Sequence, residues 1–336
     1  MTFLVKLGRR EVLGGETMAL CYSLRAQYFI EEKAFMDIST VAILSPGDMG
    51  HAVGQRLLEN EIDVVTCLAG RSDRTRSLSQ KVGIRDLATL EELVEQSDLV
   101  MSMTVSAAVP SVCQQVADAL AATGSDILFA ECSAISPRLA RELEPIITDA
   151  GGRFADVSII GGPPRPGYSP HFYASGKYAA QIEQLNDFGL TVLKLDGEVG
   201  QASGIKMCYA AMTKGSWALY TQLLMAAQFM GLTEPLLAEF GSGQQAVLQR
   251  MERTIPTVPP RSRRWVSEME EIRDTFEELG MTPHLFEGVA HMYRFIGSTP
   301  LGEEFPESRD RDRTFIETIQ QLAQHVPVRE DDGDQA

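Results

Sequence analysis

The chain has 336 residues, of which 44% are hydrophobic and 23% charged, so it is long enough for two ordinary domains with cores of their own. This composition excludes a disordered, collagenous or disulfide-stapled chain. Acidic residues outnumber Lys and Arg by 46 to 30, and the formal net charge of -16 argues against nucleic acid or an anionic membrane surface as the main partner. A small anionic substrate must therefore be held locally, by placed basic side chains and backbone N–H groups.

The cysteines are dispersed, with no CxxC motif and no cluster with histidine: Cys21, Cys67, Cys113, Cys132 and Cys208. An odd, scattered set is typical of reduced thiols, so we expect a cytoplasmic protein without a metal site. No apolar run reaches the roughly 18 residues of a transmembrane helix, and we expect no membrane partner.

Residues 1–38 mix basic and acidic side chains and lack the apolar core of a signal peptide, so we interpret them as an N-terminal extension. Short apolar strands then alternate with amphipathic helices. The predicted strands are 41–44, 62–68, 99–103, 127–130 and 153–157, and the predicted helices are 51–60, 87–96, 107–122 and 137–150. This alternation is typical of a parallel sheet covered on both faces, and it predicts an α/β, Rossmann-type domain over residues 39–199.

Beyond residue 198 the sequence carries only helical patterns. The predicted helices are 204–230, 235–252, 264–279, 284–296 and 313–326. We therefore expect an all-α C-terminal domain over residues 200–328, followed by a solvated acidic tail at 329–336.

A glycine-containing loop, Ser45-Pro46-Gly47-Asp48-Met49-Gly50, follows the first predicted strand and opens a helix. Gly47 allows the backbone to approach a pyrophosphate, Gly50 allows the helix to pack against the strand, and the helix N-terminus supplies N–H donors. Ser45 stands where the usual fingerprint has its first glycine. A glycine turn of any α/β protein is the alternative, but the position on the first strand of a βαβ series favours a dinucleotide site.

The end of the second predicted strand indicates which dinucleotide is bound. NAD-binding folds place an acidic residue there, whereas this chain offers Arg71, Ser72 and Arg74. Basic side chains suit the 2′-phosphate of NADP, so we expect NADP(H) and regard NAD as the less favoured cofactor; a solvated loop is the alternative. We also assign Met103 and Thr104, at the end of the strand at 99–103, to the cofactor site.

Two loops that follow later strands are candidates for substrate binding. Ser133 lies at the carboxyl end of a strand, where open α/β sheets bind ligands. A helix cap explains the nearby Ser136 and Pro137, but it does not explain Ser133. Gly161 and Gly162 suit a loop whose N–H groups face an anion, although a flexible turn is a serious alternative.

Lys206 lies between Ile205 and Met207 near the start of a mostly apolar helix. An apolar setting disfavours the charged amine, so we expect a pKa lowered towards the range that suits proton transfer. Tyr209 and Thr213 share its helix face. A lysine that extends its charge to solvent from a helix end is an equally good interpretation of this residue alone.

Four segments, at residues 45–50, 131–137, 155–162 and 200–206, occur in the same order as motifs of the β-hydroxyacid dehydrogenases, and the chain resembles this family. The family includes 3-hydroxyisobutyrate dehydrogenase and 6-phosphogluconate dehydrogenase. Residues 45–50 are similar to the family's Gly-Leu-Gly-x-Met-Gly, 131–137 to its Asp-x-Ser-Thr-x-Ser-Pro, and 155–162 to its Asp-Ala-Pro-Val-Ser-Gly-Gly. Gly200, Ala202 and Lys206 match its Gly-x-Gly-x-x-x-Lys. The later helices resemble a branch in which a 6-phosphogluconate-dehydrogenase-like cofactor domain carries a short helical C-terminal domain.

The resemblance implies an NADP-dependent oxidoreductase that transfers a hydride between the nicotinamide and a small β-hydroxy acid or its semialdehyde. It assigns Lys206 as the acid/base, and Ser133 with the Gly161–Gly162 amides as holders of the substrate. The family's Asn four residues after the lysine is Ala210 here, which leaves Tyr209 or Thr213 as candidates for the missing polar group.

Two alternatives remain. An imine reductase has a similar fold but usually lacks the lysine, so Lys206 argues against it; a non-catalytic NADPH-binding module stays open because of Ala210.

The long helix from Gly204 is apolar around much of its circumference, so we also expect a homodimer with this helix in the interface.

Overall fold

The computed structural model describes residues 37–327. Cys21, nearly all of the expected N-terminal extension and the acidic tail lie outside the described residues. None of the helices between residues 37 and 327 has the length and apolarity needed to cross a membrane.

The first half forms one eight-stranded sheet with the order β3-β2-β1-β4-β5-β6-β7-β8. The strands are β1 (Thr40–Leu44), β2 (Asp63–Thr66), β3 (Arg85–Asp86), β4 (Leu99–Ser102), β5 (Leu128–Glu131), β6 (Arg153–Ile160), β7 (His171–Ser175) and β8 (Thr191–Lys194). All neighbouring strands are parallel except β6 and β7. The predicted Rossmann-type fold is confirmed.

Helices connect the strands and cover the sheet. They are α2 (Gly50–Leu58), α3 (Asp73–Val82), α4 (Leu90–Glu95), α5 (Val109–Thr123), α6 (Pro137–Asp149) and α7 (Ala179–Glu183). Every residue of β4 and β5 is buried, because helices pack on both faces of the central strands. The core between α5, α6 and the sheet includes Leu120, Phe129 and Phe154.

Three strands were not predicted. β3 is only two residues long, and half of β8 is exposed, so neither carries a clear apolar pattern. β7 lies antiparallel to β6 after a proline-rich stretch that sequence patterns assign to a loop. The Arg/Ser-rich segment after β2 forms α3, because Ser72 caps its first turn and Gly83, with φ 83°, ends it.

The second half is helical, as predicted, and the structure assigns no strand between β8 and residue 327. Its helices are α8 (Gln201–Phe229), α9 (Thr233–Gly243), α10 (Gln245–Thr254), α11 (Pro259–Glu278), α12 (His284–Ser298) and α13 (Phe315–Ala323). The predicted helix at 235–252 is interrupted at Gln244. α11 begins five residues earlier than predicted, because Pro259 and Pro260 fit the first turn of a helix.

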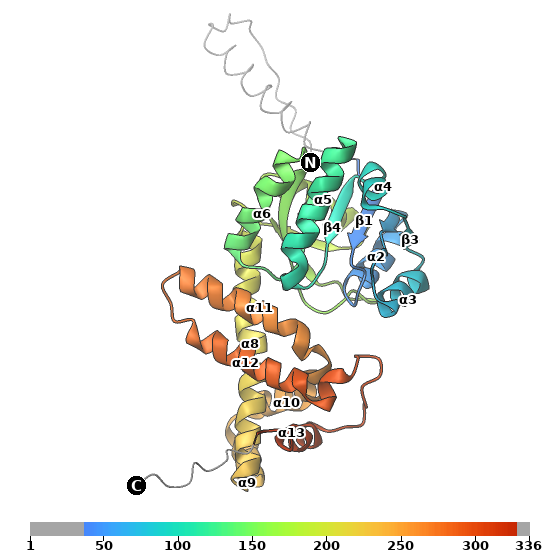
Figure 1. Ribbon diagram of the computed structural model, residues 1–336. Coiled ribbons are helices and arrows are strands. Elements are labelled where there is room, and N and C mark those ends of the chain that lie inside the picture. The colour runs from blue at the N-terminus through green and yellow to red at the C-terminus, as the bar shows by residue number, and fades with distance from the viewer. Residues whose placement is uncertain (1–36, 328–336) are drawn as a thin grey trace, which may run out of the picture. The chain divides into compact units, whose positions relative to one another are not determined.

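α8 connects the sheet to the helical core. It contacts β6 at its start and α11, α12 and α13 further along, and Figure 1 shows α11 and α12 crossing it. The core of this part contains Trp265 and Tyr293, whose ring centroids are 5.3 Å apart, and the Tyr293 hydroxyl donates to the Lys214 carbonyl at 2.6 Å. This packing holds the first turns of α8 beside the carboxyl ends of the parallel strands.

Candidate active site

A cleft with a volume of about 680 Å³ lies where the carboxyl ends of the strands meet α8 and α11. It brings together residues of all four segments that the sequence singled out. The predicted residues that line it are Ser45, Gly47, Asp48, Met49, Arg74, Met103, Thr104, Ser133, Gly161, Gly162, Lys206, Tyr209 and Thr213. Pro46 and Gly50 are buried behind the loop, and Arg71 and Ser72 do not line the cleft.

The loop after β1 has the geometry of a phosphate cradle. A Cβ on Gly50 would lie 3.0 Å from both the Ile43 side chain and the Ser45 carbonyl oxygen, so any other residue would require these neighbours to shift. Ser45 adopts φ 62°, the left-handed conformation for which the usual fingerprint employs glycine, and its buried Oγ has no partner among the described residues. In the first turn of α2, the His51 and Val53 N–H groups already donate to the Gly47 and Met49 carbonyls, both at 3.0 Å. The glycine-containing turn, the unpartnered Ser45 hydroxyl and the positive end of the α2 dipole fit the pyrophosphate of a dinucleotide.

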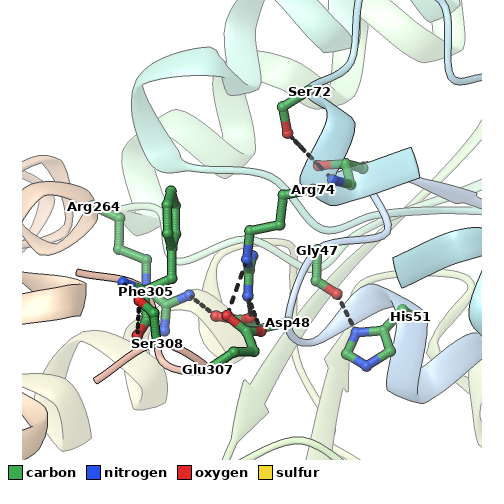
Figure 2. Close-up of polar contacts among 10 residues, drawn as sticks. Gly47, Asp48, His51, Ser72, Arg74, Arg264, Phe305, Glu307 and Ser308 are labelled. Carbon is green, nitrogen blue, oxygen red and sulfur yellow. Dashed lines mark hydrogen bonds and ion pairs between the residues drawn. The ribbon is translucent and has the colours of Figure 1, made fainter. Parts of the chain in front are cut away.

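Asp48 links this loop to the C-terminal domain (Figure 2). Its carboxylate forms ion pairs with Arg74 of α3 and, at 3.0 Å, with Arg264 of α11. Burial alone would raise the pKa of Asp48, but the two guanidinium groups outweigh it and lower the pKa. Sequence reasoning did not identify Arg264, because nothing local shows that α11 packs beside the phosphate loop.

The residues predicted to hold a 2′-phosphate have different surroundings. The Ser72 Oγ accepts the Thr75 N–H at 3.3 Å and caps α3. Arg74 is bound by Asp48 and by Glu307, which comes from the segment between α12 and α13. Arg71 is half-buried and its guanidinium has no carboxylate partner within residues 37–327. Of the predicted cluster, Arg71 is therefore the arginine that remains available to a phosphate.

Ser133 is held between the loops that follow β4 and β5. Its N–H donates to Glu131 Oε1 at 2.7 Å, and its Oγ accepts the Thr104 N–H at 3.0 Å. Burial raises the pKa of Glu131 to about 7, although hydrogen bonds from Ser133 oppose the shift. The Ser133 side chain thus lies between Thr104 and Glu131 and lines the cleft. Ser136, as predicted, caps α6 by accepting the Leu139 N–H.

The glycine pair after β6 lines the cleft and is in contact with Tyr168. Gly161 has φ 134°, and a Cβ there would lie 2.3 Å from the Tyr168 hydroxyl, so glycine is required. The Gly162 N–H donates to that hydroxyl at 3.2 Å. In this structure Tyr168 is thus the partner of the Gly162 amide, and the contact of the glycine pair with an anion stays a prediction.

Lys206 lies in the first turns of α8, and its Nζ donates to the Ile159 carbonyl at the end of β6. Desolvation by the surrounding protein lowers the pKa of Lys206 to about 8, and the positive charge of Arg264 acts in the same direction. The Thr213 Oγ1 donates to the Tyr209 carbonyl at 3.0 Å, a bond within the helix. Tyr209 is half-exposed at the cleft.

Asp156 of β6 fixes the helix that carries Lys206. Its buried carboxylate accepts the Gly200 N–H at 2.8 Å, the Ser203 N–H at 3.1 Å, the Ser203 hydroxyl at 2.7 Å and the Ser175 hydroxyl at 2.9 Å. The negative charge thus lies at the N-terminus of α8, where the helix dipole favours it. An acidic residue inside an apolar strand was the sequence signal for this role.

A second lysine lines the far end of the cleft. Lys214 forms an ion pair with Glu268 of α11, and its Nζ lies 5.4 Å from the centroid of the Trp265 ring. Burial lowers the pKa of Lys214, and the charges of Lys206 and Arg264 act in the same direction. Lys206 and Lys214 are the only lysines after residue 200, which was the available sequence signal.

Comparisons with known proteins place two domains in the chain. Residues 40–187 match the family described as the NAD binding domain of 6-phosphogluconate dehydrogenase, and residues 227–296 match a domain of unknown function, DUF1932. An uncharacterized 28.5 kDa protein of Methanothermus fervidus is 25% identical over 258 residues, which cover 76% of this chain and 98% of that protein.

Solved structures share the fold. One is a conserved protein of unknown function, described as structurally similar to 3-hydroxyacid dehydrogenases; it is 27% identical, with a TM-score of 0.55 over 77% of this chain and 96% of that one. A 3-hydroxyisobutyrate dehydrogenase from Salmonella typhimurium is 18% identical, with a TM-score of 0.62 over 84% and 99% of the two chains. The predicted resemblance is confirmed.

Proposed function

We propose that this chain, an NAD(P)-dependent dehydrogenase-like oxidoreductase, transfers a hydride between NADP and a small β-hydroxy acid or its semialdehyde. The observation that carries the proposal is the position of Lys206. Its amine, with a pKa lowered to about 8, lies in the same cleft as the phosphate loop and Ser133. A group with a pKa near the working pH is suited to both directions of proton transfer.

The residues of the cleft would act as follows. Loop residues 45–50 and the first turn of α2 would hold the pyrophosphate, and the bound nicotinamide would supply the hydride chemistry. In oxidation, the neutral Lys206 amine takes the hydroxyl proton of the substrate; in reduction, the ammonium returns it. The Ile159 carbonyl, which accepts a hydrogen bond from Nζ, limits where that amine can point.

Basic side chains support an anionic substrate. Ser133, Arg261 and Arg264 line the same cleft. Because Tyr168 uses the Gly162 amide, we assign the substrate carboxylate to Ser133 and these arginines. Ala210, where the family has Asn, is the observation that favours the alternative of a non-catalytic NADPH-binding module.

The cofactor preference is inferred from Arg71. A guanidinium can bind a 2′-phosphate through charge-assisted hydrogen bonds, whereas NAD offers only a neutral hydroxyl there. Such bonds are worth about 1.5–3 kcal/mol, so NADPH should bind roughly ten- to a hundredfold more tightly than NADH. Equal affinity for the two would contradict the assignment of Arg71.

We also propose a reducing compartment, the cytoplasm, for this protein. The four cysteines within the described residues, Cys67, Cys113, Cys132 and Cys208, are all free thiols. Free thiols of this kind persist where disulfides do not form.

The direct test is a screen of β-hydroxy acids with NADP⁺, in which NADPH formation is followed by absorbance. Wild-type protein should oxidise at least one short β-hydroxy acid, and Lys206→Ala should lower kcat by about 10²–10⁴-fold while it leaves NADPH affinity unchanged. The matched control is Lys177→Ala, because Lys177 is exposed and does not line the cleft. Wild-type kcat in Lys206→Ala would overturn the role of Lys206, and no turnover of any acid would favour the non-catalytic module.

A further inference from the structure

A segment of the C-terminal domain reaches the cofactor domain beside the phosphate loop. Residues 304–308 lie between α12 and α13, and Glu307 forms an ion pair with Arg74 at the start of α3 (Figure 2). A second bond joins the Arg74 Nε to Glu307 Oε2 at 3.3 Å. The Phe305 ring centroid lies 5.7 Å from the guanidinium carbon of Arg74. The segment thus covers Arg74 with a carboxylate and an aromatic ring.

Local contacts hold Glu307 in this position. Arg313, which is 7% exposed, donates two hydrogen bonds to the Glu304 carboxylate, at 2.6 and 2.7 Å. At the tip of the segment, the Ser308 Oγ accepts the Phe305 N–H at 2.9 Å. Arg313 thus anchors the start of the segment, and the internal bond between Phe305 and Ser308 closes the turn that carries Glu307.

Arg74 has two carboxylate partners. Asp48 and Glu307 both form ion pairs with its Nη2 (Figure 2). Asp48 also has Arg264 as a partner, whereas the ion pairs of Glu307 in the described chain involve only Arg74. A carboxylate and a phosphate oxygen bind a guanidinium in the same fork geometry. Glu307 therefore occupies an anion subsite on Arg74. Arg74 follows the helix cap Ser72 by two residues and Arg71 by three.

We propose that Glu307 is a cofactor-discriminating residue: it is an internal carboxylate on the anion subsite of Arg74, which a phosphomonoester, the 2′-phosphate of NADPH, must displace. This inference rests on the proposed binding of the 2′-phosphate near Arg71. NADH has no phosphate to place there, so it can bind while Glu307 stays on Arg74. Glu307 thus weakens the binding of NADPH but not that of NADH. The affinity ratio of the two cofactors is therefore smaller than it would be if Arg71 and Arg74 were both free to bind the phosphate.

The test is a titration of NADPH and NADH into full-length wild type, Glu307→Gln, Arg74→Ala and the double variant, followed by cofactor fluorescence at low salt. Glu307→Gln should tighten NADPH binding by roughly three- to thirtyfold, because the 2′-phosphate no longer has to break an ion pair to reach Arg74. The same substitution should change NADH binding less than about twofold. In the Arg74→Ala background the same substitution should have no effect, since the subsite is gone.

Two further variants keep the result interpretable. Glu303→Gln removes the same charge from a neighbouring exposed ion pair with Arg263, so it should change neither affinity. Glu307→Asp keeps the charge and should stay close to wild type for both cofactors. Glu307 is 56% exposed, so thermal unfolding of Glu307→Gln should match that of wild type.

Several results would overturn the inference: unchanged or weaker NADPH binding by Glu307→Gln, equal tightening of NADPH and NADH, or the same gain in the Arg74→Ala background. The wild-type affinity ratio tests the cofactor proposal separately. If wild type prefers NADH and Glu307→Gln still tightens NADPH through Arg74, the cofactor preference fails while the role of Glu307 stands. If wild type prefers NADPH and Glu307→Gln changes nothing, the role of Glu307 fails alone.

Discussion

At the scale of single residues, Asp156 links stability to the position of Lys206. One buried carboxylate accepts four hydrogen bonds, from the backbone and side chain of Ser203, the backbone of Gly200 and the side chain of Ser175. Three of these four donors belong to the start of α8, where the helix dipole presents positive charge. Asp156 is thus a positioning residue for the catalytic candidate.

Asp156→Ala should lower the free energy of unfolding by on the order of 3 kcal/mol, because it leaves several buried donors without an acceptor. The measurement is chemical denaturation of both proteins. The control is Asp118→Ala, since Asp118 is exposed on α5 and accepts one side-chain bond from Gln114; its change should stay within about 0.5 kcal/mol. Equal effects of the two substitutions would show that the bonds to Asp156 contribute little.

Some residues of the cleft could be predicted from the sequence and others could not. Ser133 and the loop at 45–50 follow strands, and the carboxyl ends of parallel strands meet at one edge of a sheet. Arg264 and the Lys214–Glu268 pair depend on how α11 packs against α8, which no local pattern reveals. The contact between Tyr168 and the Gly162 amide was not predicted, because Tyr168 lies in a proline-rich loop whose path the sequence does not indicate.

At the scale of elements, α8 has two different faces. One face packs in the helical core through residues such as Met207, Leu224 and Met225. The other presents large apolar side chains that are about half exposed or more, namely Tyr209, Met212, Leu219 and Phe229, and Met230 directly follows the helix. Several of these recur at helical spacing, so a single chain leaves an apolar stripe along α8 in contact with solvent.

We propose that a second copy of the chain covers this stripe. Light scattering at micromolar concentration should give twice the mass of one chain, and Leu219→Glu should shift the protein towards the monomer. The control is Leu279→Glu, because Leu279 is 68% exposed at the end of α11, outside the stripe. A monomeric wild type would contradict the proposed dimer.

Long elements were predictable and short ones were not. The 29 residues of α8 and the buried strands β4 and β5 carry a strong periodic or apolar signal. β3 and β8 are the two edge strands of the sheet. β3 is short and β8 is half exposed, so neither requires a run of apolar residues. Tertiary pairing, rather than local preference, therefore sets these edges.

At the scale of the whole molecule, charged contacts join the cofactor loop to the C-terminal domain. Arg264 of α11 binds Asp48 in the phosphate loop, and its charge also lowers the pKa of Lys206. Glu307 binds Arg74 from the same domain. The groups that we propose to hold the cofactor and the lysine that we propose to move the proton are thus coupled through the electrostatics of one cleft.

The proton-transfer role of Lys206 is tested most directly by the pH dependence of kcat/KM for oxidation of a β-hydroxy acid, between about pH 6 and pH 10. The amine must be neutral to accept the hydroxyl proton, so kcat/KM should rise with pH through about 8 and level off above it, and the reduction should fall through the same pH. The residual activity of Lys206→Ala should not show this rise of kcat/KM with pH. A wild-type profile that is flat from about pH 7 to pH 9, or the same rise in Lys206→Ala, would contradict the role of Lys206.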